Sequence, residues 1–274
     1  MRELRVVKAT AEAVRSLVGV IHLPPLPGSP RFRGDFRAVL EQTKRDARAL
    51  QAAGFDVAMI ENFGDTPFFS GVVPAVTVSA MTACALAAAE AGPRLALGIN
   101  VLRNDVASAL AIARVVDADC VRVNVHVGAR VTDQGIVEGR AAETLRLRRA
   151  LNADSVAIWA DVDVKHAAPL AARDIGEEAK EAHERAMADA ILVTGAATGT
   201  RVDTKKLEAV RRALPNCAIY VASGALETDL PALARLADGV IVGSALRKGG
   251  IAGGPIDAAR AAKFAKAFRS AFRQ

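Results

Sequence analysis

A short charged segment, residues 156–166 with the sequence VAIWADVDVKH, holds the side chains best suited to chemistry. Asp161, Asp163 and Lys165 are two residues apart, so on a β-strand, whose side chains alternate with a period of two, they would share one face. Burying three charges together is costly unless they pair, bind an ion or meet a charged ligand. The pattern therefore indicates a functional site, with a salt-bridged polar plug or a solvated strand end as the structural alternative.

Lys165 is compatible with three roles. It could form a Schiff base, act as a general acid, or hold a phosphate or carboxylate. Two nearby carboxylates would stabilise its protonated form, which favours the proton-donor and electrostatic roles over the imine.

The composition indicates a globular protein. The chain has 274 residues, of which 51% are hydrophobic and 24% charged, enough for one large α/β barrel of about 250 residues. The net charge is +6, but the basic residues are dispersed and aromatic residues make up only 4%. This balance argues weakly for an anionic ligand and against nucleic-acid binding, which favours a basic stripe with aromatic platforms.

The cysteines and the hydropathy pattern predict a cytoplasmic protein. Cys84, Cys120 and Cys217 lie far apart in apolar segments, as buried thiols in a reducing compartment do. The first residues lack the apolar core of a signal peptide, and no run approaches the roughly 20 apolar residues of a membrane span.

Short apolar runs alternate with amphipathic segments from end to end, which predicts a single (β/α)8 TIM barrel over residues 1–274, with a short extension at 1–15. An open doubly wound sheet is the alternative, but no GxGxxG motif opens its first helix. The expected strands are 16–22, 57–61, 94–100, 120–126, 156–165, 190–194, 217–222 and 238–243. The expected helices are 35–53, 74–91, 104–117, 140–153, 175–187, 203–213, 227–235 and 256–272.

The two ends of this barrel differ in their connections. Asp119, Asp154, Asp189 and Asp238 each precede a strand after a terse turn, and we expect them to bond local backbone donors at the structural end. The connections after the strands are longer and rich in Gly, Pro and polar residues. Active sites of such barrels lie at that end, so we expect the site there.

Polar residues near the expected strand ends are the candidates for function. The catalytic candidates are Glu61, Asp161, Asp163, Lys165 and His166. The candidates for ligand or phosphate binding are His22, Asn100, Arg122, Asn124, Thr194, Gly195, Ser223, Gly224, Gly243 and Ser244. Arg122, Asn124 and His126 share one strand parity, which places them toward the barrel interior.

These residues predict two kinds of ligand, a metal ion and a phosphate group. Glu61, Asp161 and Asp163 could meet across the barrel and hold Mg²⁺ or transfer protons, although Glu61 could instead pair with Arg122 or Lys165. The glycine-rich loops at Gly195, Gly224 and Gly243 follow the last three strands, where barrels commonly bind phosphate, although tight turns alone would also need glycine.

The strings GVIHLPPLPGSPRF, ENFGDTPF, RVNVHVGARVTDQGIVEG, ADVDVKHAAPL, TGAATG and ASGAL together resemble the BtpA family. The resemblance spans about residues 17–268 and implies a TIM-barrel fold similar to the ribulose-phosphate-binding barrels. The family takes its name from a cyanobacterial factor in photosystem I biogenesis, and its bacterial relatives accompany sugar-uptake genes and carry a nucleotide-hydrolase label. It supplies no agreed catalytic residues.

Two functions of different classes follow. The first is an enzyme, a lyase, isomerase or hydrolase, that acts on a small phosphorylated sugar or nucleotide-like ligand by carboxylate and lysine chemistry, with Mg²⁺ as a possible cofactor. The second is a non-catalytic assembly factor of the photosystem I type. Alanine-rich helix faces would also allow a homo-oligomer.

Overall fold

The computed structural model describes residues 15–164, 167–194, 203–222 and 224–272. The barrel strands are β1 (Ser16–His22), β2 (Val57–Glu61), β3 (Ala96–Asn100), β4 (Cys120–Val123), β7 (Ala157–Val162), β9 (Ala190–Val193), β10 (Ala218–Ala222) and β11 (Gly239–Val242). Within this part of the chain these eight strands form a closed barrel in the order β1-β11-β10-β9-β7-β4-β3-β2. Neighbouring strands are parallel, and the first strand pairs with the last.

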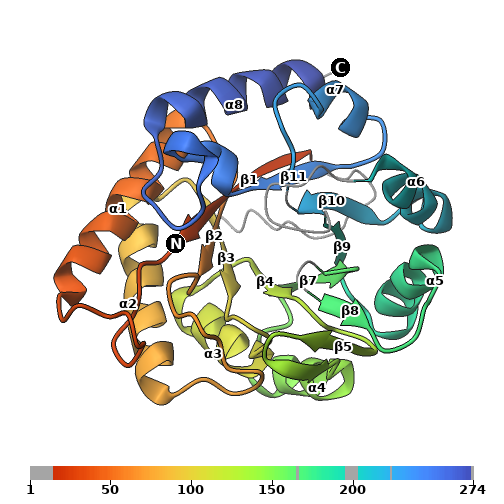
Figure 1. The fold of residues 1–274 in the computed structure, drawn as a ribbon, viewed down its shortest axis with the longest axis horizontal. Helices are drawn as coiled ribbons and strands as arrows, with labels where there is room; N and C mark the ends of the chain where they lie inside the picture. The colour runs from red at the N-terminus through yellow and green to blue at the C-terminus, as the bar shows by residue number, and fades with distance from the viewer. Residues whose placement is uncertain (1–14, 165–166, 195–202, 223, 273–274) are drawn as a thin grey trace.

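Helices surround the barrel in chain order, so that α8 lies beside α1 (Figure 1). They are α1 (Phe36–Ala53), α2 (Ala75–Ala91), α3 (Val106–Val116), α4 (Ala141–Ala150), α5 (Ile175–Lys180), α6 (Thr204–Ala213), α7 (Leu230–Leu233) and α8 (Ala258–Phe272). A π-helical turn, η1 (Glu181–Arg185), continues α5, and two 3-10 turns, η2 (Ser244–Leu246) and η3 (Lys248–Gly250), follow β11. The TIM-barrel prediction is confirmed.

Aspartate caps begin several of these helices. The side chain of Asp35 accepts a hydrogen bond from the Ala38 N–H at 3.0 Å, and Asp105 and Asp203 cap α3 and α6 in the same way. Helix α1 ends at Gly54, whose φ of 80° lies in the left-handed region that favours glycine. Local sequence therefore sets where these helices begin and end.

The strands bury side chains on both faces. Met59, Trp159 and Tyr220 point into the barrel, where the rings of Trp159 and Tyr220 stack with centroids 4.6 Å apart. The alternate residues, such as Ile60 and Ile158, pack against the surrounding helices. The two-sided burial explains why these strands are near-continuous apolar runs.

Aspartates at the N-terminal ends of the strands join neighbouring strands. Each accepts the N–H of a residue in an adjacent strand, at 2.7 to 2.9 Å: Asp56 from Leu17, Asp119 from Leu97, Asp189 from Ile158, and Asp238 from Ile219. The prediction that Asp119, Asp189 and Asp238 bond to local backbone donors is therefore wrong, because their donors lie in neighbouring strands. Asp154 does not take part, because its carboxylate pairs with Arg149 at 2.8 Å on the surface.

A small antiparallel sheet, which the sequence did not predict, follows β4 and β7. Its strands β5 (Ala129–Thr132), β6 (Gly135–Glu138) and β8 (Ala167–Pro169) pair in the order β6-β5-β8. Val125, Val137 and Val164 form a separate buried cluster with it. Figure 1 shows β5 and β8 beside the ends of β4 and β7.

Candidate active site

Strand register brings three of the predicted residues side by side at the C-terminal end of the barrel. His22 pairs in register with Glu61, and Glu61 with Asn100. The Asn100 Nδ2 donates to Glu61 Oε1 at 3.0 Å, and His22 Nε2 lies 4.0 Å from Glu61 Oε2. Glu61 is therefore the centre of this group.

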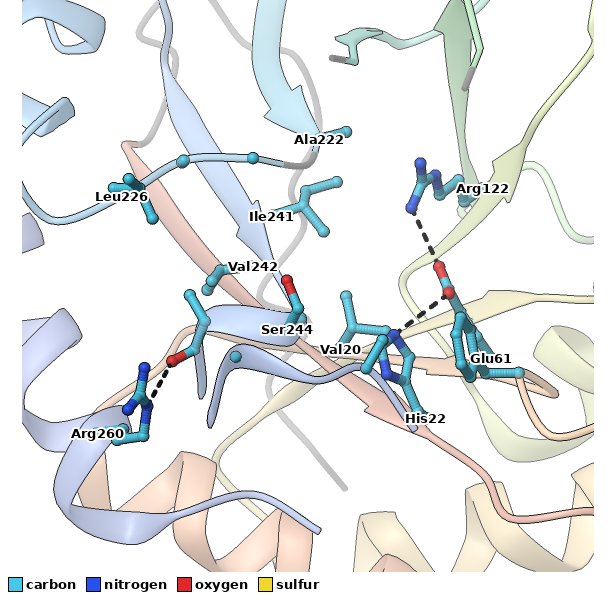
Figure 2. Close-up of a pocket in the computed structure, with 17 residues that line it drawn as sticks. Val20, His22, Glu61, Arg122, Ala222, Leu226, Ile241, Val242, Ser244 and Arg260 are labelled. Atoms are coloured by element: carbon cyan, nitrogen blue, oxygen red, sulfur yellow. Dashed lines mark hydrogen bonds and ion pairs between the residues drawn. The ribbon is translucent and has the colours of Figure 1, made fainter. Parts of the chain in front are cut away.

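Arg122 joins Glu61 to Asp161 (Figure 2 shows its contact with Glu61). Its Nε and Nη2 donate to the two oxygens of Asp161 at 2.9 and 3.0 Å, and its Nη1 donates to Glu61 Oε1 at 3.0 Å. Burial lowers the pKa of Arg122, but Asp161 and Glu61 outweigh it and hold that pKa above its ordinary value. The guanidinium thus compensates two buried carboxylates.

The two carboxylates differ in accessibility. The side chain of Asp161 is 0% exposed, and its Oδ2 also accepts from Asn124 Nδ2 at 2.6 Å. The side chain of Glu61 is 8% exposed and lines two cavities. Glu61, rather than Asp161, is thus the carboxylate that a ligand can contact.

Asp163 does not join this group. Strand β7 ends at Val162, and Asp163 has a left-handed φ of 53°, so the predicted shared face with Asp161 is not formed. Its carboxylate forms an ion pair with Lys206 of α6 instead. The Thr194 hydroxyl donates to the Asp163 carbonyl at 2.8 Å, which ties the ends of β7 and β9 together.

The expected magnesium site is not formed by Glu61, Asp161 and Asp163. Arg122 lies between the first two, and Asp163 turns to Lys206. Among the residues that the structure describes, no group of three His, Cys, Asp or Glu side chains is arranged to hold a metal ion.

A first cavity of about 210 Å³ opens beside Glu61 (Figure 2). Its wall combines the Glu61, His22 and Arg122 side chains with the loops after β10 and β11, which contribute Gly224, Gly243 and Ser244. Arg260, at the start of α8, also lines it and donates from Nε to the Ala245 carbonyl at 3.0 Å. The cavity therefore combines one carboxylate with two guanidinium groups.

His22 is held from several sides. Its Nδ1 accepts the Gly253 N–H at 3.1 Å, and its ring stacks on Phe63 with centroids 4.2 Å apart. Because Nδ1 is an acceptor, this network assigns the proton to Nε2, which faces Glu61. A Cβ on Gly243 would lie 3.1 Å from the His22 ring, so glycine permits the close approach.

Arg247 anchors the last loop beneath this cavity. Its buried guanidinium donates to the carbonyls of Val20, Gly243 and Gly254. Burial lowers the pKa of Arg247 to about 10 and raises the pKa of nearby Asp46 to about 6. One side chain thus joins β1 to the loop that carries Ser244.

A second cavity of about 420 Å³ shares the wall residues Glu61, Phe63 and Arg122 with the first. Its wall includes Phe63, Phe68, Asn100, Arg103 and Asn124. Phe68 and Arg103 come from the loops after β2 and β3. Glu61 therefore lies between two compartments.

The remaining predicted residues are separate from this site or lie outside the described part of the chain. His126 was predicted to point toward the barrel interior with Arg122 and Asn124. Strand β4 ends at Val123, however, and the His126 Nε2 hydrogen-bonds to the Ala186 carbonyl at 2.9 Å. Lys165, His166, Gly195 and Ser223 lie outside the described residues. Sequence reasoning missed the cavity residues Phe63, Phe68, Arg103 and Arg260; the loop ENFGDTPFF was recognised, but nothing in it distinguished its aromatic residues from packing residues.

The comparison with known families agrees with the sequence motifs. A family model described as "BtpA family" matches residues 13–270. The chain belongs to the BtpA family. The photosystem I biogenesis protein BtpA of Synechocystis is 43% identical over 260 residues, covering 94% of this chain and 89% of that protein. An uncharacterized protein of Thermococcus kodakarensis is 42% identical over 249 residues, covering 91% and 93%.

Several solved structures share the fold of this BtpA-family chain, although their sequence identity to it is low. A native KDPGal structure has a TM-score of 0.58 at 15% identity, covering 94% of each chain. KGPDC from Streptococcus mutans has a TM-score of 0.57 at 10% identity, covering 94% of this chain and 99% of that one. Phosphoribosyl anthranilate isomerase from Thermus thermophilus has a TM-score of 0.55 at 14% identity, covering 93% and 98%.

In the part of the chain that the structure describes, no helix combines the length and apolar character needed to cross a bilayer.

Proposed function

We propose that this BtpA-family chain is an enzyme that acts on a small phosphorylated sugar or nucleotide-like ligand, with Glu61 as its acid–base group. The observation that carries the proposal is the position of Glu61. It lies between two cavities, held through Oε1 by Asn100 and Arg122, with Oε2 toward His22. A carboxylate fixed at a cavity wall in this way is suited to proton transfer.

The first cavity is proposed to hold the phosphate. Arg260 gives it a guanidinium whose Nε bonds to the Ala245 carbonyl, and the loops at Gly224 and Gly243 bring small residues to its wall. The loops after the last two strands of such barrels commonly bind phosphate. The name of one structural neighbour, a phosphoribosyl anthranilate isomerase, agrees with this ligand class.

In this proposal Glu61 carries the proton and His22 stabilises charge. Glu61 takes a proton from the ligand and returns it to a neighbouring ligand atom, while the Nε2–H of His22 donates a hydrogen bond to the ligand atom on which negative charge develops. Arg122 neutralises negative charge that develops next to Glu61, and Asp161 positions Arg122. Lyase, isomerase and hydrolase reactions all fit such a pair.

Thermal shift with phosphorylated compounds tests the phosphate site. A ligand at 100 times its Kd stabilises a protein by about 2.7 kcal/mol, or roughly 5 to 11 °C for a chain of this size. Arg260→Gln should lose most of this shift, whereas Lys266→Gln, an exposed lysine on the same helix, should retain it. If no phosphorylated compound, including inorganic phosphate, shifts the wild type, the proposal is wrong.

Turnover tests the role of Glu61. Glu61→Gln keeps the hydrogen-bonding shape but removes the base, so it should lower turnover by about 10² to 10⁴ while phosphate still stabilises the protein. Full activity of Glu61→Gln would contradict the assignment.

The second candidate function is a non-catalytic assembly factor. The observation that favours it is the 43% identity to a protein named for photosystem I biogenesis. It predicts that Glu61→Gln leaves the biological role intact and that a protein partner co-purifies in stoichiometric amount. Loss of the role in Glu61→Gln would favour the enzyme.

A further inference from the structure

The second cavity differs from the first in its charge. Arg122 and Arg260 face a single carboxylate, Glu61, in the first cavity. In the second, Arg103 and Arg122 face two carboxylates, Glu61 and Asp133. The described side chains of the second cavity therefore sum to no net charge, whereas those of the first are net positive.

The guanidinium of Arg103 is already engaged. Its Nε donates to Gln134 Oε1 at 3.1 Å, and its Nη2 lies 3.8 Å from an Asp133 oxygen, both at the turn between β5 and β6. Its central carbon lies 5.3 Å from the centre of the Phe68 ring. Burial lowers the pKa of Arg103, against the opposing effect of Asp133 and Glu61.

The other guanidinium, that of Arg122, is also committed, because its contacts go to Asp161 and Glu61. A second anionic group on the ligand would thus compete with Glu61 and Asp161 for Arg122, and with Asp133 for Arg103. The carboxylates already balance the charge of both guanidinium groups, so the second cavity attracts a second anion less than the first cavity attracts a phosphate.

Aromatic and amide groups supply the rest of the wall. Phe63 and Phe68 present rings, and Asn100 and Asn124 present amides. The Oδ1 of Asn124 is buried and accepts no hydrogen bond from any described residue. A ligand that brings a hydroxyl or amino group to this wall would relieve an unsatisfied acceptor. Rings combined with a few polar groups are typical of sites for neutral, hydrogen-bonding ligands.

We infer that the ligand carries one anionic group, held in the first cavity, and an uncharged polar head with an apolar face, held in the second cavity against Phe68. This inference rests on the proposed function and narrows its substrate class. Sugar monophosphates and nucleoside monophosphates have this chemistry, whereas sugar bisphosphates and phosphorylated carboxylic acids do not. The atom that reacts then lies over Glu61, between the two compartments.

Calorimetric titration of the wild type with four compounds tests the inference: inorganic phosphate, ribose 5-phosphate, adenosine 5′-monophosphate and fructose 1,6-bisphosphate. We expect at least one monophosphate to bind tenfold or more tightly than inorganic phosphate, and the bisphosphate to bind more weakly than that monophosphate. If only ribose 5-phosphate binds more tightly than inorganic phosphate, the second cavity holds a sugar. If only adenosine 5′-monophosphate does, the second cavity holds a base.

Two neighbouring phenylalanines provide a matched pair of variants. Phe68 lines the second cavity, whereas Phe69 is 53% exposed and does not. Phe68→Leu should lose the tenfold gain but still bind inorganic phosphate, which shows that the fold and the first cavity persist. Phe69→Leu should retain the gain, and Phe68→Trp should restore most of it.

Three results separate the inference from the proposed function. If every phosphate compound binds equally, or if the bisphosphate binds most tightly, the inference is overturned while the phosphate site stands. Equal effects of Phe68→Leu and Phe69→Leu also overturn it. If no compound binds, the proposed function fails and the inference fails with it.

Discussion

Removal of the Arg122 guanidinium is the sharpest test of how the site is built. Arg122→Met keeps the volume of the side chain but leaves Glu61 and Asp161 without their cation. Both carboxylates are at least nine-tenths buried, and three hydrogen bonds of 2.9 to 3.0 Å from the guanidinium are lost. Removing one partner of a buried ion pair costs about 3 to 5 kcal/mol. At about 2 to 4 °C per kcal/mol, the melting temperature should fall by roughly 6 to 20 °C.

A surface ion pair of the same chemistry provides the control. Arg149 donates to Asp154 at 2.8 Å, but the two side chains are 80% and 52% exposed, so Arg149→Met should cost less than about 1 kcal/mol. Urea denaturation followed by circular dichroism measures both variants. If Arg122→Met were no more destabilising than Arg149→Met, the buried network would not have the energetic role described for it.

Two further predictions concern other parts of the fold. Asp238→Ala removes the acceptor of the Ile219 N–H and should cost about 1 to 3 kcal/mol, whereas Asp154→Ala should cost less than about 0.5 kcal/mol; equal losses in urea denaturation would refute this. Burial raises the pKa of Asp46 from 3.8 to about 6, so its carboxyl contributes stability below about pH 4 that is lost as the pH rises through 6. The unfolding free energy of Asp46→Asn relative to wild type should therefore rise by about 2 kcal/mol between pH 4 and pH 7, and a constant difference would be inconsistent with a raised pKa.

Most of the barrel could be predicted because its signals are local. Each barrel strand lies within its predicted run. Strand β8 was missed because it pairs with β5 across 35 to 39 residues of sequence, a contact that no local pattern encodes. Strands β5 and β6 form a local hairpin, but each has four residues of which only one is buried, so neither has the apolar run that marked the barrel strands. The π-helical turn at Glu181–Arg185 was also hidden, since its side chains suit an α-helix equally well.

The candidate site could be predicted only in part. His22, Glu61 and Arg122 were found because each is a polar residue at the end of an apolar strand. Asp163 was misplaced because the period of two was extended past the end of the strand, where the backbone takes a left-handed conformation. That Glu61 rather than Asp161 lines the cavities could not be predicted, since the exposure of a carboxylate depends on which neighbours cover it.

The closure of the barrel between β1 and β11 sets when the site can first exist during synthesis. Gly253 bonds to His22 across 231 residues, and Arg247 bonds to Val20 across 227. At roughly 5 to 20 residues per second, a ribosome needs roughly 12 to 46 s to add 231 residues. Throughout that interval β1 has an open edge that can pair with other chains. Glu61 and His22 are therefore made early, but Gly253, which bonds to the His22 ring, is added 231 residues after His22, and the first cavity can close only once that loop exists.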